Sequence, residues 1–304
     1  MNIIETTSLN CRFGRTEAVS DLTLAVPEGS VYAFLGPNGA GKTTTIKMLL
    51  NILRPTAGEA CVLGLASTEL GPPQLAQIGY VSENQQLPEW MTVAQLLAYC
   101  RPFYPTWDDA FCQKLLADFE LPADRKLRSL SRGMKVKAAL VSSLAYRPRL
   151  LVLDEPFSGL DPLVRDEFIR GILELAEQDG WTIFVSSHDI DEVERLADHV
   201  GVIDRGRLHL SETTESLQAR FRRVDFAVER PPERWLTATP PPSWLVPDIA
   251  GHRVRFVESR YRPGETEREI RDRFPGASEP LIEPLSLREI FLTLARTFRF
   301  QAEL

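Results

Sequence analysis

An apolar run at residues 31–35 leads directly into a glycine-rich turn and then into a segment with helical spacing. The run reads Val-Tyr-Ala-Phe-Leu, the turn has glycines at 36, 39 and 41, and the helical pattern continues to residue 53, before Pro55. A short apolar run is typical of a buried strand, and proline commonly follows the end of a helix. The sequence therefore predicts a strand, a tight turn and a helix in succession.

The same alternation continues along the chain. Further apolar runs lie at residues 78–81, 150–153, 182–185 and 200–203. Segments with helical spacing lie between and beyond them, at residues 93–100, 111–119, 136–145, 162–178 and 190–197. Alternating strands and helices are typical of α/β domains built on parallel sheets. We therefore predict an α/β domain with a mostly parallel sheet over residues 1–210.

The composition changes after residue 210. Ten of the 22 prolines follow residue 230, strand patterns lie at residues 224–228 and 254–257, and residues 265–274 read as a polar helix. In residues 286–298, apolar side chains recur at three- and four-residue spacings, which is typical of an amphipathic helix. Its polar face lacks an excess of Lys and Arg, so packing on the domain's own core is favoured over a membrane surface. Residues 211–304 are predicted to be a small α+β accessory domain.

The overall composition is that of a globular chain with a sizeable core, with 43% apolar and 25% charged residues among 304. No apolar run approaches the ~20 residues needed to cross a bilayer, and residues 1–6 show no signal-peptide pattern. The four cysteines form no CxxC pair, which favours free thiols. We expect any action at a membrane to depend on a partner.

The formal charge of −7 lies in residues 1–211, which hold 20 basic and 27 acidic side chains. The remaining residues balance 15 Arg with 15 acidic side chains. Proteins that bind nucleic acid normally meet its phosphates with clustered Lys and Arg. Nucleic acid is therefore not an expected partner.

Residues 36–43 fit the phosphate-loop pattern GxxxxGK[ST], with the required strand before it and helix after it. In such a loop, backbone N–H groups cradle a nucleotide phosphate at the positive end of the helix. Lys42 would bridge the β- and γ-phosphates, and the Thr43 hydroxyl would coordinate Mg²⁺. The alternative is a glycine turn without a ligand, which the flanking elements disfavour. The predicted nucleotide-binding residues here are Gly36, Pro37, Asn38, Gly39, Ala40, Gly41, Lys42, Thr43 and Thr44.

The predicted strand at residues 150–153 runs into two acidic residues, Asp154 and Glu155. Asp154 is suited to holding Mg²⁺, directly or through water. Glu155 is suited to polarising a water in line with the γ-phosphate, as phosphoryl transfer requires. The alternative is that the two acids cap a helix, which Pro156 and the turn at residues 158–161 disfavour.

His188 follows the predicted strand at residues 182–185. A lone histidine after a strand is more often structural than catalytic. Here the strand comes after the Asp154-Glu155 strand in chain order, so its end is expected beside the phosphate loop. We therefore predict that His188 senses the γ-phosphate and acts in catalysis together with Glu155 and Lys42.

These motifs resemble those of the ATP-binding subunits of ATP-binding cassette (ABC) transporters over residues 1 to about 210. Five motifs occur in the family's order: the phosphate loop, residues 130–135, Asp154-Glu155, residues 158–161 and His188. The resemblance implies a P-loop NTPase cassette, in which two copies of the chain close on two ATP molecules. Hydrolysis would then reopen the dimer and drive a separate membrane subunit.

The resemblance also assigns residues outside the phosphate loop. Residues 130–133 look like the signature motif, in which Ser131 and Gly133 would meet the γ-phosphate bound on the opposite subunit. Asp161 belongs to a turn similar to the loop that links the two sites. Phe13 occupies the place where the family puts an aromatic ring against the adenine, with a role in the core as the open alternative.

Two motifs depart from the family's pattern. The signature normally reads Ser-Gly-Gly-Gln, whereas here Arg132 brings a cation near the partner's nucleotide and Met134 replaces the glutamine. A second loop carries Glu83 where the family has glutamine. This carboxylate can still ligate Mg²⁺ but would repel the γ-phosphate more than an amide does. Gln85 or Gln86 is the open alternative for the role of that glutamine.

The family's helical subdomain corresponds to about residues 87–145 and contacts the membrane subunit. Residues 286–292 resemble the terminal helix of members that usually serve exporters with a separate membrane subunit. The resemblance thus implies a transport ATPase at the cytoplasmic face of the membrane, attached through its permease. The competing interpretations are a soluble cassette ATPase acting on DNA or ribosomes, and a simple phosphate-loop kinase, which would not need His188.

Overall fold

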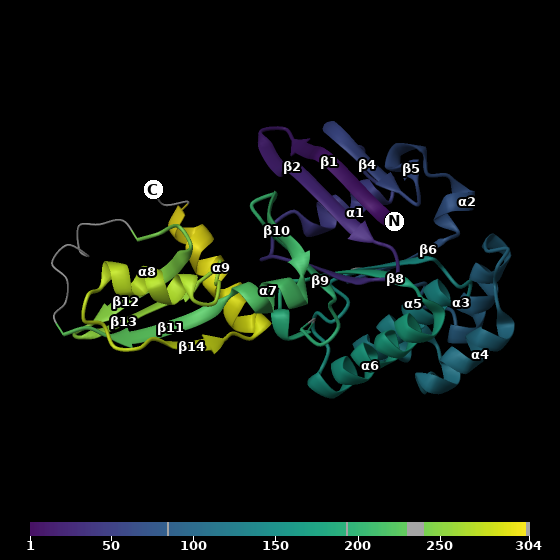
Figure 1. Cartoon of the computed structure of the whole chain (residues 1–304). Helices are drawn as coiled ribbons and strands as arrows, with labels where there is room; N and C mark the ends of the chain where they lie inside the picture. Colours follow the sequence, from purple (N-terminus) through teal and green to yellow (C-terminus); the bar gives the residue numbers. More distant parts are fainter. Residues whose placement is uncertain (84, 193, 230–239, 302–304) are drawn as a thin grey trace. The chain divides into compact units, whose positions relative to one another are not determined.

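The computed structural model describes residues 1–83, 85–192, 194–229 and 240–301. Its chain divides into two compact units, Met1–Ser211 and Glu212–Leu304, which we describe separately (Figure 1). The first unit has an α/β fold with two sheets. The second has an α+β fold, so both parts of the predicted fold class are confirmed.

A six-stranded sheet forms the centre of the first unit. In spatial order its strands are β10 (Arg207–Thr213), β9 (His199–Asp204), β3 (Val31–Leu35), β8 (Thr182–Ser187), β7 (Leu150–Asp154) and β6 (Ile78–Ser82). The five strands from β9 to β6 pair in parallel, as predicted from the apolar runs. Every residue of β3, β7 and β8 is buried, which is expected when helices or a second layer cover both faces.

A second, four-stranded sheet was not predicted. Its strands are, in spatial order, β2 (Thr16–Pro27), β1 (Asn2–Phe13), β4 (Ala57–Val62) and β5 (Leu65–Ala66), and the pairs are antiparallel. Helix α1 (Lys42–Leu49) lies between this sheet and the parallel one (Figure 1). Its side chains Ile46, Met48 and Leu49 join both sheets in one buried core. The helix ends earlier than residue 53, where the prediction placed its end.

Further helices pack beside the parallel sheet: α2 (Pro72–Leu75), α3 (Val93–Cys100), α4 (Asp109–Asp118), α5 (Arg132–Leu144) and α6 (Pro162–Asp179). Side chains fix where they begin. Thr92 caps α3 by accepting from Gln95 N at 3.1 Å, and the Gln95 side chain accepts from Thr92 N in return at 2.9 Å. The predicted helix at residues 190–197 is wrong for the described residues, which form only a 3₁₀ turn at Ile190–Glu192.

The second unit is built on an antiparallel sheet with the order β12 (Trp244–Ala250), β13 (Arg253–Glu258), β11 (Arg222–Ala227) and β14 (Leu281–Pro284). Its helices are α7 (Thr214–Arg220), α8 (Glu265–Arg273) and α9 (Leu287–Gln301). A core of aromatic and aliphatic side chains joins α8 to one face of the sheet, and within it Trp244 stacks on Phe256 with ring centroids 3.9 Å apart. Leu287, Ile290 and Leu294 of α9 are buried, as the amphipathic pattern predicted. None of the helices in the described ranges is long and apolar enough to cross a membrane.

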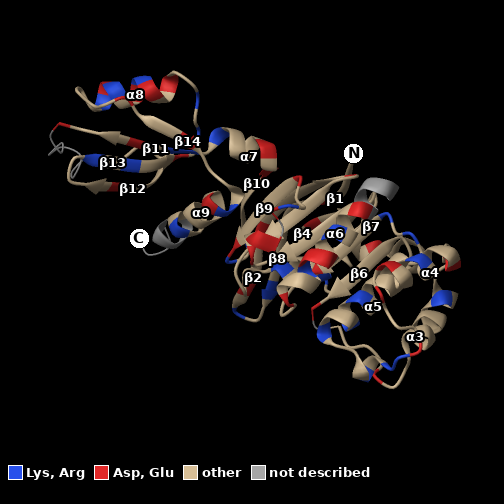
Figure 2. Ribbon diagram, turned by 90° about the horizontal axis from the view of Figure 1, so that it is seen from below, with Lys and Arg blue, Asp and Glu red and all other residues tan. Residues whose placement is uncertain are grey.

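An acidic side chain organises the other face of this sheet. Asp225 of β11 accepts from Arg253 Nε through Oδ1 and from Arg255 Nε through Oδ2, both at 2.6 Å. Both arginines belong to β13, whose basic positions are visible in Figure 2. Burial alone would raise the pKa of Asp225, but the two guanidinium groups lower it overall. The carboxylate therefore links the two strands.

We expect Asp225→Asn to lower the free energy of opening of β11 and β13 at neutral pH by about 1 kcal/mol, since both arginines are half exposed. Because the folded pKa is lowered, the contribution exists above the unfolded pKa of about 4 and is lost as pH falls through the folded value. Amide hydrogen exchange in the full chain measures it. Glu283→Gln is the control, because Glu283 lies 3.9 Å from Arg223 and is half exposed. Equal effects of the two changes would contradict the assignment.

Candidate functional site

The phosphate loop connects the carboxyl end of β3 to the start of α1, and two of its glycines are required by close packing. A Cβ at Gly36 would lie 2.1 Å from the carbonyl oxygen of Ile203. Gly41 caps α1 with φ +106°, and a Cβ there would lie 2.5 Å from the carbonyl oxygen of Ala18. Pro37, Asn38 and Gly39 form the exposed tip of the loop, between the buried Gly36 and Ala40.

The Lys42 ammonium is buried beneath this loop. Its Nζ donates to Gly36 O at 2.6 Å and to Pro37 O at 3.0 Å. It also lies 3.0 Å from Glu155 Oε1 as an ion pair, although this contact lacks the angle of a hydrogen bond. Both side chains are less than a tenth exposed. The ion pair and the two carbonyls together compensate for removing the ammonium from water.

Asp154 ends β7 and is held by two hydroxyl groups. Its Oδ1 accepts from Thr43 Oγ1 at 3.1 Å and from Ser186 Oγ at 2.7 Å. Burial raises the pKa of Asp154, and both hydroxyl bonds act in the opposite direction. Asp154 is in register with Ser186 of β8, which also accepts from Glu155 N at 3.0 Å. The sequence prediction missed Ser186, although its small polar side chain at a strand end was a usable signal.

Glu155 lies between Lys42 and His188. Its Oε2 lies 2.7 Å from His188 Nδ1, on the side opposite the Lys42 contact through Oε1. Its backbone has φ +52°, a left-handed conformation that is uncommon for a residue other than glycine and is often found at functional sites. The structure thus brings together all three residues predicted to be catalytic.

A network of polar groups around the buried Ser187 and Glu192 supports the segment after His188. Ser187 Oγ donates to Glu192 Oε2 at 2.5 Å and accepts from Asp189 N at 3.0 Å. Arg165 of α6 lies 3.7 Å from Glu192 Oε1 and 3.9 Å from Asp189 Oδ2. Burial raises the pKa of Glu192. The sequence prediction also missed these residues, because only the fold brings α6 to this loop.

Oxygen donors suited to Mg²⁺ meet at the end of β7. Thr43 Oγ1 and Asp154 Oδ1 are 3.1 Å apart. Over the part of the chain that the structure describes, no three His, Cys, Asp or Glu side chains form a metal cluster. Mg²⁺ commonly takes one or two protein ligands and completes its shell with phosphate oxygens and water. A hydroxyl beside a carboxylate fits that mode of binding.

The predicted signature residues lie at the start of α5, and Asp161 of the predicted linking loop lies at the start of the neighbouring helix α6. Ser131 caps α5, and its Oγ accepts from Met134 N at 3.2 Å. A Cβ at Gly133 would lie 2.8 Å from Val164 Cγ1, so the start of α5 packs closely on α6. Asp161 Oδ1 accepts from Val164 N at 3.0 Å at the start of α6.

The backbone of Glu83 is bonded to the end of β7, whereas its side chain contacts Ser158 and Arg132. Its N donates to Asp154 O at 2.8 Å, while its Oε1 accepts from Ser158 Oγ at 2.6 Å and from Arg132 at 3.2 Å. Gln85 lines the same small cavity of about 100 Å³ as Glu83. A metal-binding role for Glu83 and the alternative role for Gln85 or Gln86 both stay predictions.

Phe13 lies at the end of β1 and is 53% exposed. The alternative that it is a core residue is therefore wrong. Its position against an adenine stays a prediction.

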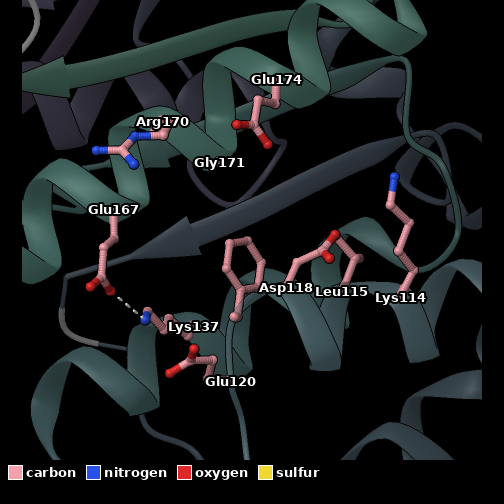
Figure 3. A pocket seen from close by; sticks show the side chains of 10 residues that line it. Lys114, Leu115, Asp118, Glu120, Lys137, Glu167, Arg170, Gly171 and Glu174 are labelled. Atoms are coloured by element: carbon pink, nitrogen blue, oxygen red, sulfur yellow. Dashed lines mark hydrogen bonds and ion pairs between the residues drawn. The ribbon is translucent and has the colours of Figure 1, made fainter.

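A separate hollow of about 310 Å³ lies among α4, α5 and α6 (Figure 3). Charges of both signs line it, and Lys137 Nζ lies 3.0 Å from Glu167 Oε2 across its edge. Its lining comes from these helices and the residues next to them rather than from the phosphate loop, so it is distinct from the site described above.

Comparisons with known proteins agree on one family. A sequence model described as "ABC transporter" matches residues 19–158. The chain is 35% identical over 223 residues to the bacitracin transport ATP-binding protein of Bacillus licheniformis, covering 73% of each protein. It is also 35% identical over 247 residues to the daunorubicin/doxorubicin resistance ATP-binding protein of Streptomyces peucetius, covering 77% of this chain and 74% of that one.

A solved structure of the ATP-binding subunit of an ABC transporter is similar to this chain, with a TM-score of 0.65 and 27% identity. The similarity covers 71% of this chain and 92% of that one.

We expect Ser186→Ala to lower the free energy of opening of β7 and β8 by about 1–3 kcal/mol, because it removes a donor from buried Asp154 and an acceptor from Glu155 N. Amide hydrogen exchange in those strands measures the change. Ser142→Ala is the matched control, since the Ser142 hydroxyl is buried but donates to Ala139 O of its own helix at 2.8 Å. A Ser186 effect no larger than that of the control would show that the hydroxyl does not anchor the strand end.

Proposed function

Because the chain belongs to the ATP-binding subunits of ABC transporters, we propose that the polar cluster around Glu155 is its centre for ATP hydrolysis. The chain is an ATPase subunit, and ATP is its substrate. One observation carries the assignment: Lys42 contacts one carboxylate oxygen of Glu155 and His188 contacts the other. Both contacts lie at the edge of the parallel sheet where the phosphate loop begins.

Each residue then has a chemical role. The backbone N–H groups of residues 38, 39 and 41–44 and the Lys42 ammonium bind the phosphates, as the open helix end favours. Glu155 orients the attacking water and accepts its proton. His188 senses the γ-phosphate and also fixes the Glu155 carboxylate from the other side. Phe13 lies against the adenine. Thr43 and Asp154 would hold Mg²⁺, which supplies charge neutralisation for the phosphates when bound.

Two copies of the chain complete each site. We assign Ser131 and Gly133 of one copy to the γ-phosphate held by the other, with Asp161 between the two sites. Support comes from the family and from the position of Ser131 and Gly133 at the start of α5, where backbone N–H groups favour an anion.

ATP hydrolysis drives a separate membrane subunit, the permease. The chain is attached to the cytoplasmic face of the membrane through that permease. The names of the relatives, which concern bacitracin transport and drug resistance, favour export. Residues 1–210 are the ATPase domain, with a helical subdomain at about residues 87–145, and residues 211–304 are the accessory domain. Three exposed aromatic residues of the helical subdomain, Trp90, Tyr99 and Phe103, are available for the membrane subunit.

Glu155→Gln tests the assignment of the catalytic base. The amide keeps the shape of the side chain but cannot accept the proton, so turnover should fall about 10²–10⁴-fold. ATP binding should persist, and the ATP complex should elute as a dimer in size-exclusion chromatography. Lys42→Ala is the comparison, because it should lose ATP binding as well. Retained turnover in Glu155→Gln would refute the base, and an ATP-bound monomer would refute the closed dimer.

Ser131→Arg tests the sharing of sites between two copies. Hydrolysis should fall at least about 100-fold, because a bulky cation replaces a hydroxyl that faces the partner's phosphate. ATP affinity of a single subunit, measured by titration of dilute protein, should change by less than about twofold, which is within ~0.4 kcal/mol. Ser129→Arg is the control, since Ser129 is also exposed and lies two residues earlier. A collapse of affinity would place Ser131 in the subunit's own site.

A further inference from the structure

The two motif departures noted in the sequence meet in the structure. Arg132 stands where the family's signature motif has glycine, and Glu83 stands where the family's loop after β6 has glutamine. In the structure, Arg132 Nη2 lies 3.2 Å from Glu83 Oε1. Each substitution alone would add an unbalanced charge. Together they make one ion pair, which joins the loop after β6 to the first turn of α5.

A third segment joins this pair. Ser158 Oγ donates to the same Glu83 oxygen at 2.6 Å. The Arg132 guanidinium lies directly over Gly159, where a Cβ would come 2.7 Å from Nη1 and 2.9 Å from Cζ. The turn after the Asp154-Glu155 strand end is therefore packed against the ion pair, and it can approach so closely because it has glycine at that position.

The pair also connects to the hydrolytic centre. Glu83 N donates to Asp154 O at 2.8 Å, so the backbone of the loop that carries Glu83 is bonded to the end of β7. Glu83, Arg132, Ser158 and Glu155 all line one cavity of about 100 Å³. A shift of the Glu83 loop therefore reaches the residues that flank Glu155.

Helix stability does not explain why Arg132 is there. A cation at the first position of a helix faces the positive end of the helix dipole, which is unfavourable. The ion pair is also partly exposed, at 53% for the Arg132 side chain and 33% for that of Glu83. Exposed pairs of this kind contribute little to overall stability. The geometry instead favours a role in fixing the relative positions of the three segments.

We propose that Glu83, Arg132 and Ser158 form a polar clasp that positions the start of α5 and the turn at residues 158–161 against the end of β7. Arg132 and Glu83 are positioning residues for ATP hydrolysis, and this inference rests on the proposed function of the Glu155 site. The clasp replaces the glutamine and glycine of the family's pattern by one charge pair. Its loss misplaces the signature residues while nucleotide binding at the phosphate loop remains.

Charge reversal tests the clasp. We expect Arg132→Glu and Glu83→Arg each to lower kcat about 10-fold or more, because small misplacements of catalytic groups are costly. The KM for ATP should stay within about twofold and the Tm within about 2 °C, as for other exposed pairs. The double variant with both reversals should recover kcat to within about threefold of the parent, because the pair is restored with opposite polarity.

Arg149 and Glu28 provide the matched control. Their ion pair, at 2.6 Å, also joins two distant stretches of the same unit and is similarly exposed, at 55% and 39%, but it lies outside the motifs. Arg149→Glu and Glu28→Arg should leave kcat within about twofold, since an exposed pair outside the clasp contributes little.

The outcomes separate the clasp from the proposed function and from a direct phosphate contact by Arg132. If the single reversals leave kcat unchanged while Glu155→Gln abolishes turnover, the clasp is wrong and the hydrolytic site stands. If the single reversals are inactive and the double variant is not rescued, the clasp is overturned in favour of a phosphate contact, because a glutamate at position 132 would repel that phosphate. If Glu155→Gln retains turnover, the proposed function fails first.

Discussion

The in-register pairing of three parallel strands determines where the site can form. Asp154 at the end of β7 is opposite Ser186 of β8, and Ser187 of β8 is opposite Leu35 at the end of β3. Parallel strands end at the same edge of the sheet, so the phosphate loop, the acidic pair and His188 all emerge there. Because side chains alternate between faces, a slip of one residue would turn Asp154 away from Ser186.

Burial at this edge makes its charges depend on one another. Lys42 and Glu155 are each less than a tenth exposed, and removing one member of such a pair leaves an uncompensated buried charge at a cost of about 3–5 kcal/mol. Glu155 also has a left-handed backbone, and such strain is sustained only where the surroundings fix it. Here Ser186 accepts the Glu155 N–H, while Lys42 and His188 hold the two carboxylate oxygens. The site is therefore ordered by its own contacts.

The parts of this arrangement that depend on local sequence could be predicted. Strands β3, β7 and β8 contain apolar runs because both of their faces are buried, and the positions of Lys42, Asp154 and His188 follow from their ends. The antiparallel sheet escaped prediction because β1 is exposed on one side and its pairing is interrupted by register shifts, which breaks the alternation of polar and apolar residues.

Other features needed the fold itself. The predicted helix after residue 190 has a start signal, since Asp189 Oδ1 accepts from Asp191 N at 3.0 Å as a helix cap does, but the described residues there form only the 3₁₀ turn Ile190–Glu192. Arg165 reaches Glu192 only because α6 passes beside that turn. Glu83 and Arg132 are 49 residues apart in sequence, and each looked like an isolated exception until the structure placed them together.

The distribution of charge explains why these two exceptions belong together. Lys42 balances Glu155 and Arg132 balances Glu83, whereas Asp154 receives neutral hydroxyl donors from Thr43 and Ser186. Asp154 is thus the carboxylate whose charge a divalent cation best complements, which supports the proposed Mg²⁺ position. A glutamate at position 83 without Arg132 would add a third carboxylate near the phosphates and repel them. By engaging Glu83, the proposed clasp allows an acidic side chain in this loop.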